Sequence, residues 1–150
     1  MIDLDRTDRK ILDILQRQGR ISMTDLAEQI GLSTSPCSER VRRMERDRVI
    51  TGYHARIDPQ AIGKTLLVFV EITLSSKSGD VFDKVRQELL HVPEVVECHR
   101  VTGDDCYVMT AYVRDVEHLE RVIDEFTAYG QTTTAIMQSA PVPRRGLPLP

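Results

Sequence analysis

The residues best suited to chemistry are arginines that recur on one side of a short helical pattern. Residues 36–47 read PCSERVRRMERD, in which Cys37, Val41 and Met44 follow helical spacing and are predicted to point inward. The opposite side is polar and basic. Its residues are Ser38, Glu39, Arg42, Arg43 and Arg46. Guanidinium groups on an exposed helix side can bind phosphates or guanine edges, so this pattern predicts a helix that enters DNA.

A shorter helical pattern lies directly before it. Ser22 followed by Asp25 resembles a shortened capping box, and Gly31 stands where a helix commonly ends in a left-handed residue. Pro36 suits the first position of the second helix. We therefore predict a helix-turn-helix over about residues 22–41 with a recognition helix over about 36–47. The candidate DNA-binding residues are Ser33, Thr34, Ser35, Ser38, Glu39, Arg42, Arg43 and Arg46.

A solvated, salt-bridged surface helix is the alternative, because Glu39–Arg43 and Arg42–Glu45 have pairing distances along a helix. The distribution of charge favours DNA. The whole chain of 150 residues has a net charge of −3, yet residues 36–48 hold five Arg against three acids. Positive charge is thus local to the candidate element, as electrostatic docking requires.

The preceding residues, Leu4 to Gln18, predict a further helix with Asp5 as its cap and an apolar stripe. Residues 49–57, VITGYHARI, predict a short strand or a wing beside the DNA backbone, and residues 58–63 predict a turn at a domain boundary. We assign residues 1–60 to a winged helix-turn-helix domain.

Residues 61–140 predict an α+β domain of ferredoxin-like order, βαββαβ. Leu66 to Leu74 alternates as a strand, and three further strands and two helices follow. The expected elements are a helix over 78–91, strands over 95–102 and 106–113, a helix over 115–128 and a strand over 132–139. The inward stripes include Val85 and Leu89 in the first helix and Val116, Leu119, Ile123 and Phe126 in the second.

Both helices would cover one face of this sheet and leave the other open. That open face is expected to carry Leu67, Phe69, Val95 and Val101. An apolar sheet face of this size indicates association, and a homodimer would also supply two recognition helices. The Pro- and Arg-rich residues 141–150 predict an extended tail.

Other function classes are poorly supported. The three cysteines have no metal-ligand spacing and are expected to be core residues, and the four histidines form no ligand set. No nucleophile with its base and no phosphate-binding glycine loop is present, so an enzyme is not expected. The strands lack the aromatic pattern of an RNA-binding sheet. No apolar run could cross a bilayer, and we expect a cytoplasmic protein without membrane, metal or cofactor.

Several blocks together resemble one family. The segments LDRTDRKILDILQRQGRIS, STSPCSERVRR and VTGDDCYVM, in this order, are similar to the Lrp/AsnC, or feast/famine, transcription regulators. The resemblance runs over residues 3–140. It implies an N-terminal winged helix-turn-helix, a C-terminal RAM (ACT-like) domain, and homodimers that often assemble into octamers.

The resemblance also implies an amino-acid effector bound near subunit interfaces. The family's effector turn corresponds here to Thr102, Gly103, Asp104, Asp105 and Tyr107, with Thr133, Thr134 and Ala135 of the last strand close by. Gly103 could expose backbone groups to a carboxylate and either aspartate could meet an ammonium group, although Gly-Asp is also common in plain hairpin turns. Many relatives carry G-D-x-D-Y, whereas this chain reads GDDCY. The prediction is a DNA-binding regulator with an amino-acid effector; the alternative is an architectural DNA-binding protein that has lost the effector response.

Overall fold

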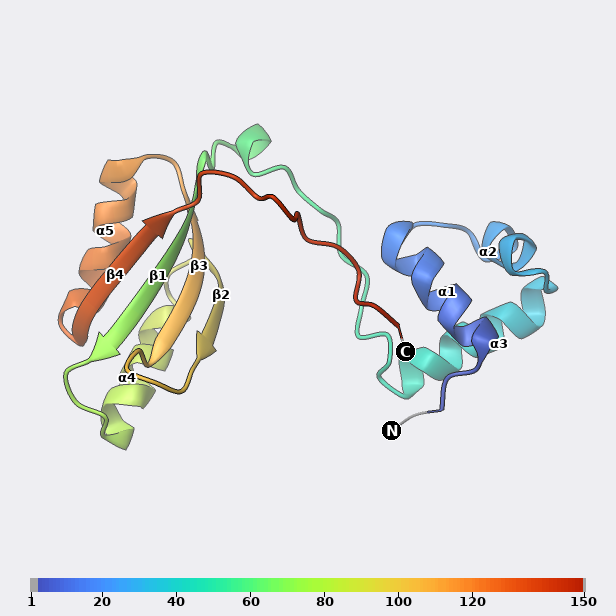
Figure 1. Ribbon diagram of the computed structural model, residues 1–150, viewed down its shortest axis with the longest axis horizontal. Coiled ribbons are helices and arrows are strands. Elements are labelled where there is room, and N and C mark those ends of the chain that lie inside the picture. The colour runs from blue at the N-terminus through green and yellow to red at the C-terminus, as the bar shows by residue number, and fades with distance from the viewer. Residues whose placement is uncertain (1–2, 150) are drawn as a thin grey trace. The chain divides into compact units, whose positions relative to one another are not determined.

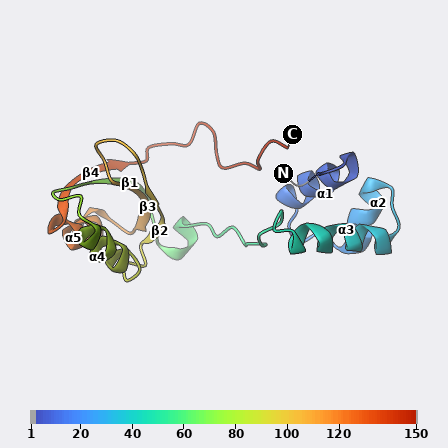
Figure 2. The same ribbon diagram turned by 90° about the horizontal axis from the view of Figure 1, so that it is seen from below.

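The computed structural model describes residues 3–149, which form two compact units (Figures 1 and 2). The first consists of residues 3–56 together with 142–149. The second is Ile57–Pro141. Among the described residues, no helix is both long enough and apolar enough to cross a membrane.

Helix α1 (Arg6–Arg17) begins with a complete capping box. The Asp5 carboxylate accepts hydrogen bonds from the backbone N–H groups of Thr7 and Asp8, both at 2.8 Å, and the Asp8 carboxylate accepts one from the Asp5 N–H at 3.1 Å. These bonds satisfy N–H groups that have no partner inside the helix. The predicted helix over Leu4 to Gln18 is confirmed, with slightly narrower bounds.

Helices α2 (Met23–Ile30) and α3 (Thr34–Arg46) complete the helix-turn-helix. Ser22 caps α2 by accepting the Asp25 N–H at 3.1 Å, and Gly31 ends it in the left-handed conformation at φ 76°. Helix α3 begins two residues before the predicted start, after Ser33, so Pro36 is its third residue. Proline is tolerated there because N–H groups of the first turn have no intrahelical partner.

Of the two alternatives predicted for residues 49–57, a short strand or a wing, the strand is wrong. Residues 51–57 have no regular structure, and a 3₁₀ turn, η1 (Gln60–Ile62), follows them. The segment is rich in strand-forming residues, but a strand also needs a partner for its backbone groups. Among the described residues no neighbouring strand pairs with this segment.

The second unit has the predicted βαββαβ order. Its elements are β1 (Leu66–Leu74), α4 (Gly79–Leu89), β2 (Val95–Arg100), β3 (Tyr107–Val113), α5 (Val116–Thr127) and β4 (Gly130–Ile136). The strands form one antiparallel sheet in the order β2-β3-β1-β4, and both helices lie on the same side of it (Figure 2).

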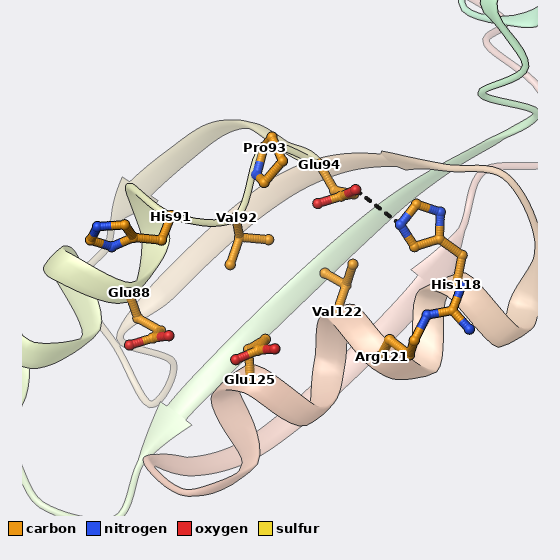
Figure 3. Close-up of a pocket in the computed structure, with 9 residues that line it drawn as sticks. All are labelled: Glu88, His91, Val92, Pro93, Glu94, His118, Arg121, Val122 and Glu125. Atoms are coloured by element: carbon orange, nitrogen blue, oxygen red, sulfur yellow. Dashed lines mark hydrogen bonds and ion pairs between the residues drawn. The ribbon is translucent and has the colours of Figure 1, made fainter.

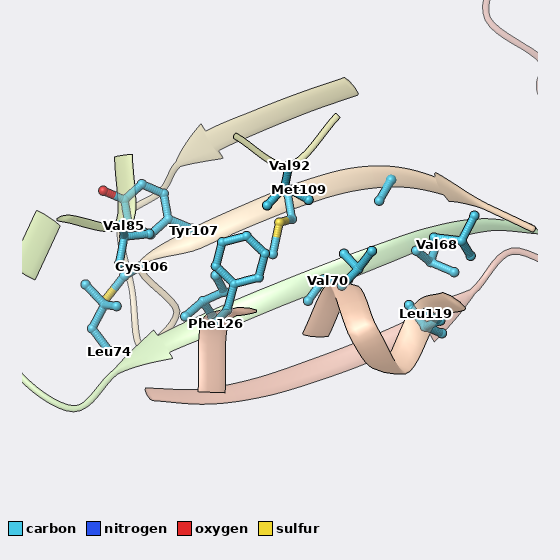
Figure 4. Packing of buried hydrophobic residues seen from close by; sticks show 14 residues of the cluster. Val68, Val70, Leu74, Val85, Val92, Cys106, Tyr107, Met109, Leu119 and Phe126 are labelled. Carbon is cyan, nitrogen blue, oxygen red and sulfur yellow. The ribbon is translucent and has the colours of Figure 1, made fainter. Parts of the chain in front are cut away.

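The core of this unit lies between the sheet and the helices (Figure 4). Phe126 of α5 is fully buried there beside Val70 and Met109 of the sheet. Val116 was expected to face inward but is 54% exposed, because the buried stripe of α5 runs through Leu119, Val122 and Phe126 instead.

In the part of the chain that the structure describes, no helix lies over the opposite sheet face. Phe69 is 41% exposed on this face, and Leu67, Val108 and Tyr112 are partly exposed. Val95 was expected here, but a register shift between Val95 and Glu97 pairs Val95 with buried Ala111, and its side chain packs against the core. The irregularity changes which residues of β2 face the helices, and alternation alone could not predict it.

Residues 142–149 contact the first unit without forming a helix or a strand. The Gln16 side chain of α1 donates to the Leu147 carbonyl at 3.2 Å and accepts the Leu147 N–H at 2.6 Å. Leu149 packs against the core of the first unit. The tail thus adds a short backbone contact to the back of a small helical core.

Candidate DNA interface and effector loop

The N-terminal half of α3 presents most of the predicted DNA-binding residues on one surface. A shallow hollow is lined by Thr34, Ser35, Pro36, Ser38, Glu39 and Arg42. These side chains are exposed apart from Ser38, which is half-buried, because Cys37, Val41 and Met44 bury the other side of the helix. The periodicity that fixes the core therefore also places the candidate contacts.

The first turn of α3 suits an anionic group. The Ser33 side chain makes no capping hydrogen bond, and Pro36 has no N–H. The N–H groups at the start of the helix therefore remain directed outward, where the helix dipole favours negative charge. Arg42 borders the same hollow two turns further along.

The three predicted arginines differ in their partners. Arg42 forms no ion pair with any described residue, and Arg46 contacts Glu39 at 3.3 Å on the exposed side. Arg43 instead turns towards α1, where its Nη2 donates to the Asp8 carboxylate at 2.5 Å. Of these three arginines, Arg42 is therefore the one whose charge is least neutralised by described residues.

Arg40 of α3 also binds the start of α1, and the sequence analysis did not predict this contact. It donates to Asp5 at 2.5 Å and to Asp8 at 2.9 Å. The backbone N–H of Asp8, and next the Arg40 guanidinium, lower the pKa of Asp5, while the Asp5 hydrogen bond raises the pKa of Arg40. One signal was available, because Asp8 falls on the stripe of α1 that also holds Ile11, Leu12 and Leu15.

Tyr53 joins the segment after α3 to the helix itself. Its hydroxyl donates to the Glu45 carboxylate at 3.0 Å. Partial burial of the phenol, followed by the nearby Glu45 carboxylate, raises the pKa of Tyr53 to about 12, so the hydroxyl stays a donor at neutral pH. This bond holds residue 53 beside the outer surface of α3.

The predicted effector turn is an exposed loop between β2 and β3. Gly103 has φ 120°, in the region that favours glycine, and its carbonyl accepts from the Lys77 ammonium at 3.4 Å. Asp105 accepts from the Thr73 hydroxyl of β1 at 2.8 Å. Thr102, Gly103 and Asp104 are exposed, which leaves their polar groups accessible to a ligand or a second subunit.

The other predicted effector residues lie apart from one another. Tyr107 is buried on the helix side, where its hydroxyl donates to the Phe82 carbonyl at 3.3 Å. Thr133 and Thr134 point to opposite faces of β4 because strand side chains alternate. Gln131 pairs with Thr73 and therefore lies nearer the loop than Ala135, which pairs with Phe69.

A cleft on the helix side of the second unit was not predicted (Figure 3). It has a volume of about 300 Å³ and lies between the end of α4, the segment that follows α4, and α5 from His118 to Glu125. Glu94 closes one end by accepting from His118 at 2.9 Å, and Lys64 lies 3.6 Å from the same carboxylate. The described residues contain no group of His, Cys, Asp or Glu arranged to hold a metal ion.

A helix-turn-helix joined to a ferredoxin-like domain defines a class of two-domain DNA-binding regulators. Comparison with known proteins places the chain within that class. Residues 4–51 match the winged helix-turn-helix DNA-binding family, and residues 67–147 match the Lrp/AsnC ligand binding domain. The chain belongs to the Lrp/AsnC family, a family of transcription regulators rather than enzymes, and is a DNA-binding transcriptional regulator.

Individual relatives agree with this assignment. The chain is 45% identical to the leucine-responsive regulatory protein of Escherichia coli K12 over 123 residues, which are 82% of this chain and 75% of the relative. A feast or famine regulatory protein from M. tuberculosis, complexed with L-methionine, is similar at 34% identity and TM-score 0.86, covering 97% of this chain and 99% of the other. A Neisseria meningitidis transcriptional regulator, also an L-methionine complex, is similar at 26% identity and TM-score 0.90, covering 97% of each chain.

Proposed function

We propose that the protein binds operator DNA through the N-terminal half of α3, with Thr34, Ser35 and Ser38 at the phosphates or base edges and Arg42 as the principal cation. The observation that carries this proposal is the surface around the first turns of α3, where outward N–H groups, hydroxyls and an arginine without an ion pair in the described residues meet. Such a surface combines positioning by phosphates with readout of bases.

Replacing Arg42 tests the proposal directly. If Arg42 reads a base, Arg42→Ala should weaken specific binding by about 1–3 kcal/mol, which is roughly 5- to 150-fold in Kd. The operator would first be located by footprinting on the DNA upstream of the protein's own gene. Arg17→Ala is the matched control, because Arg17 is an exposed arginine of α1 that pairs with Asp13. Equal affinity for Arg42→Ala and wild type would remove Arg42 from the interface.

For the second unit we propose binding of an amino acid at the loop of Thr102–Asp105, between subunits. Exposed Gly103 and Asp104 offer backbone and carboxylate groups that suit a zwitterion. The two methionine complexes among similar structures make methionine the first candidate. Thermal shift against the twenty amino acids should find at least one that stabilises the protein, and Asp104→Asn should weaken that effect. Failure of all twenty would favour the architectural alternative.

We further propose that the open sheet face forms a homodimer and that homodimers assemble into octamers. Phe69 and its partly exposed neighbours Leu67, Val108 and Tyr112 lie around Thr110 on a face that no helix of the described residues covers. A charge at its centre would be buried without a partner in the dimer. Phe69→Glu should therefore shift the sedimentation coefficient towards that of a monomer, whereas Ile62→Glu, at an exposed residue of η1, should not.

A further inference from the structure

We propose that Asp8 is a positioning residue that holds Arg43 away from DNA, so that α3 is fixed on α1 and Arg42 rather than Arg43 contacts phosphate. This inference rests on the proposed binding of DNA by α3. It assigns different roles to two adjacent arginines that sequence patterns treat alike.

The Asp8 carboxylate accepts hydrogen bonds from three donors. Its Oδ1 accepts from Arg40 Nη1 at 2.9 Å, and its Oδ2 accepts from Arg43 Nη2 at 2.5 Å and from the Asp5 N–H at 3.1 Å. Both guanidinium groups come from α3, whereas the carboxylate and the N–H belong to the start of α1. The cluster is therefore a direct polar connection between the recognition helix and the helix behind it.

Because Asp8 is buried, moving Arg43 from the Asp8 carboxylate to a phosphate is costly. The Asp8 side chain is 1% exposed, so the carboxylate depends on protein donors instead of water. If Arg43 turned outward to a phosphate, it would leave a buried carboxylate with fewer donors, which is costly in a medium of low dielectric constant. Asp8 therefore competes with DNA for Arg43, although the Arg43 side chain is itself 41% exposed.

Arg42 lies in the opposite situation. Successive helical residues point about 100° apart, which follows from about 3.6 residues per turn, so Arg42 leaves α3 towards solvent while Arg43 leaves it towards α1. Arg42 borders the hollow at the start of α3 and has no ion pair among residues 3–149. It can bind a phosphate without breaking any contact to a carboxylate.

The salt dependence of DNA binding separates the two roles. The affinity falls as salt rises, and each phosphate contact adds about 0.9 to the magnitude of the slope of log K against log salt, to which the values for the variants refer. Arg42→Gln should lower the slope by about 0.9 per subunit. Arg43→Gln should leave the slope unchanged but lower the melting temperature. Asp8→Asn should lower the melting temperature and raise the slope by up to about 0.9 per subunit, since it releases Arg43. An unchanged slope would show that Asp8 does not keep Arg43 from the phosphates. Asp13→Asn is the control, because Asp13 is an exposed acid of α1 paired with Arg17.

The outcomes are separable. A slope that falls as much for Arg43→Gln as for Arg42→Gln would overturn the proposal, since Arg43 would then be a phosphate contact. If circular dichroism shows that Asp8→Asn does not fold, the slopes of Arg42→Gln and Arg43→Gln still show which arginine contacts phosphate. An unchanged slope for Arg42→Gln, with wild-type binding intact, would reject the proposed interface itself. In the double variant Asp8→Asn/Arg43→Gln, any increase in slope caused by Asp8→Asn should disappear.

Discussion

Each unit contains a carboxylate that joins elements distant in sequence, and the two differ in their surroundings. Asp8 is 1% exposed and binds two guanidinium groups, whereas the Glu94 side chain is 16% exposed and binds His118 and Lys64. Guanidinium groups stay charged at any accessible pH, while a neutral imidazole can still donate one hydrogen bond. In the DNA-binding unit, two arginines of α3 thus hold that helix on α1 through a buried carboxylate. In the second unit, the corresponding carboxylate binds a histidine and a lysine and is less buried.

The two cores explain part of this difference. Three helices enclose a small group of buried side chains around Ile11, Leu26 and Met44, while the sheet unit buries a larger group around Phe126. A small core gives less stabilisation, so a single buried ionic cluster is a larger share of the total. We expect the DNA-binding unit to respond to loss of its carboxylate more strongly than the sheet unit.

The substitution with the largest expected effect tests whether the two units unfold independently, so that their stabilities can be compared. Phe126→Ala removes a fully buried ring and should destabilise the sheet unit by about 3–5 kcal/mol through the lost burial and the cavity left behind. Thermal unfolding, followed by proteolysis with fragment identification, should show the second unit melting earlier while residues 6–46 stay protected. Equal loss of protection in both units would show that they unfold together and would end the comparison.

Loss of each carboxylate should give unequal effects. Asp8→Ala leaves Arg40 and Arg43 without their shared partner and should cost about 2–3 kcal/mol, less than for a wholly buried pair because both arginines reach solvent. Glu94→Ala should cost about 1 kcal/mol or less, since its contacts are nearer the surface. Urea unfolding of both variants gives the two values, and equal values would contradict the comparison.

Acid should act on Glu94 in a defined direction. Burial alone would raise the pKa of Glu94, but its own backbone N–H, the His118 hydrogen bond and the charge of Lys64 outweigh burial and lower that pKa below 4.5. Because the folded-state pKa is below the unfolded one, this stabilisation is complete above about pH 4.5 and is lost as the pH falls through the folded value. Glu94→Gln should therefore flatten the loss of stability below pH 4.5. The control is Glu120→Gln, an exposed acid of α5, which should keep the wild-type profile.

The sequence predicted the helices, strands and topology because their signals are local. Ser22, Gly31 and the alternation of Leu66 to Leu74 each act on nearby backbone. The predictions are wrong where contacts between residues distant in sequence determine the structure. Residues 49–57 pair with no strand within residues 3–149, and a register shift turns Val95 towards the core.

The candidate sites show the same division. Helical spacing placed Arg42 and Ser38 on the outer side of α3, but spacing could not distinguish Arg42 from Arg43. That distinction depends on Asp8, which is 35 residues before Arg43 in the chain. The resemblance groups Thr133 and Thr134 as candidate effector residues, although pairing with β1 gives these adjacent threonines opposite faces.

The smallest expected effect concerns the tail on the first unit. Gln16 bonds both backbone groups of Leu147, and Leu149 adds a partly buried apolar contact, so Gln16→Ala should release the tail at a cost of about 0.5–1 kcal/mol because these bonds are exposed. Hydrogen exchange should accelerate at the Leu147 amide, whereas Gln29→Ala, at an exposed glutamine of α2, should leave it unchanged. Faster exchange throughout α1 in the Gln16 variant would mean that the tail contributes to the core of the DNA-binding unit. The cores of the two units would then differ less in size.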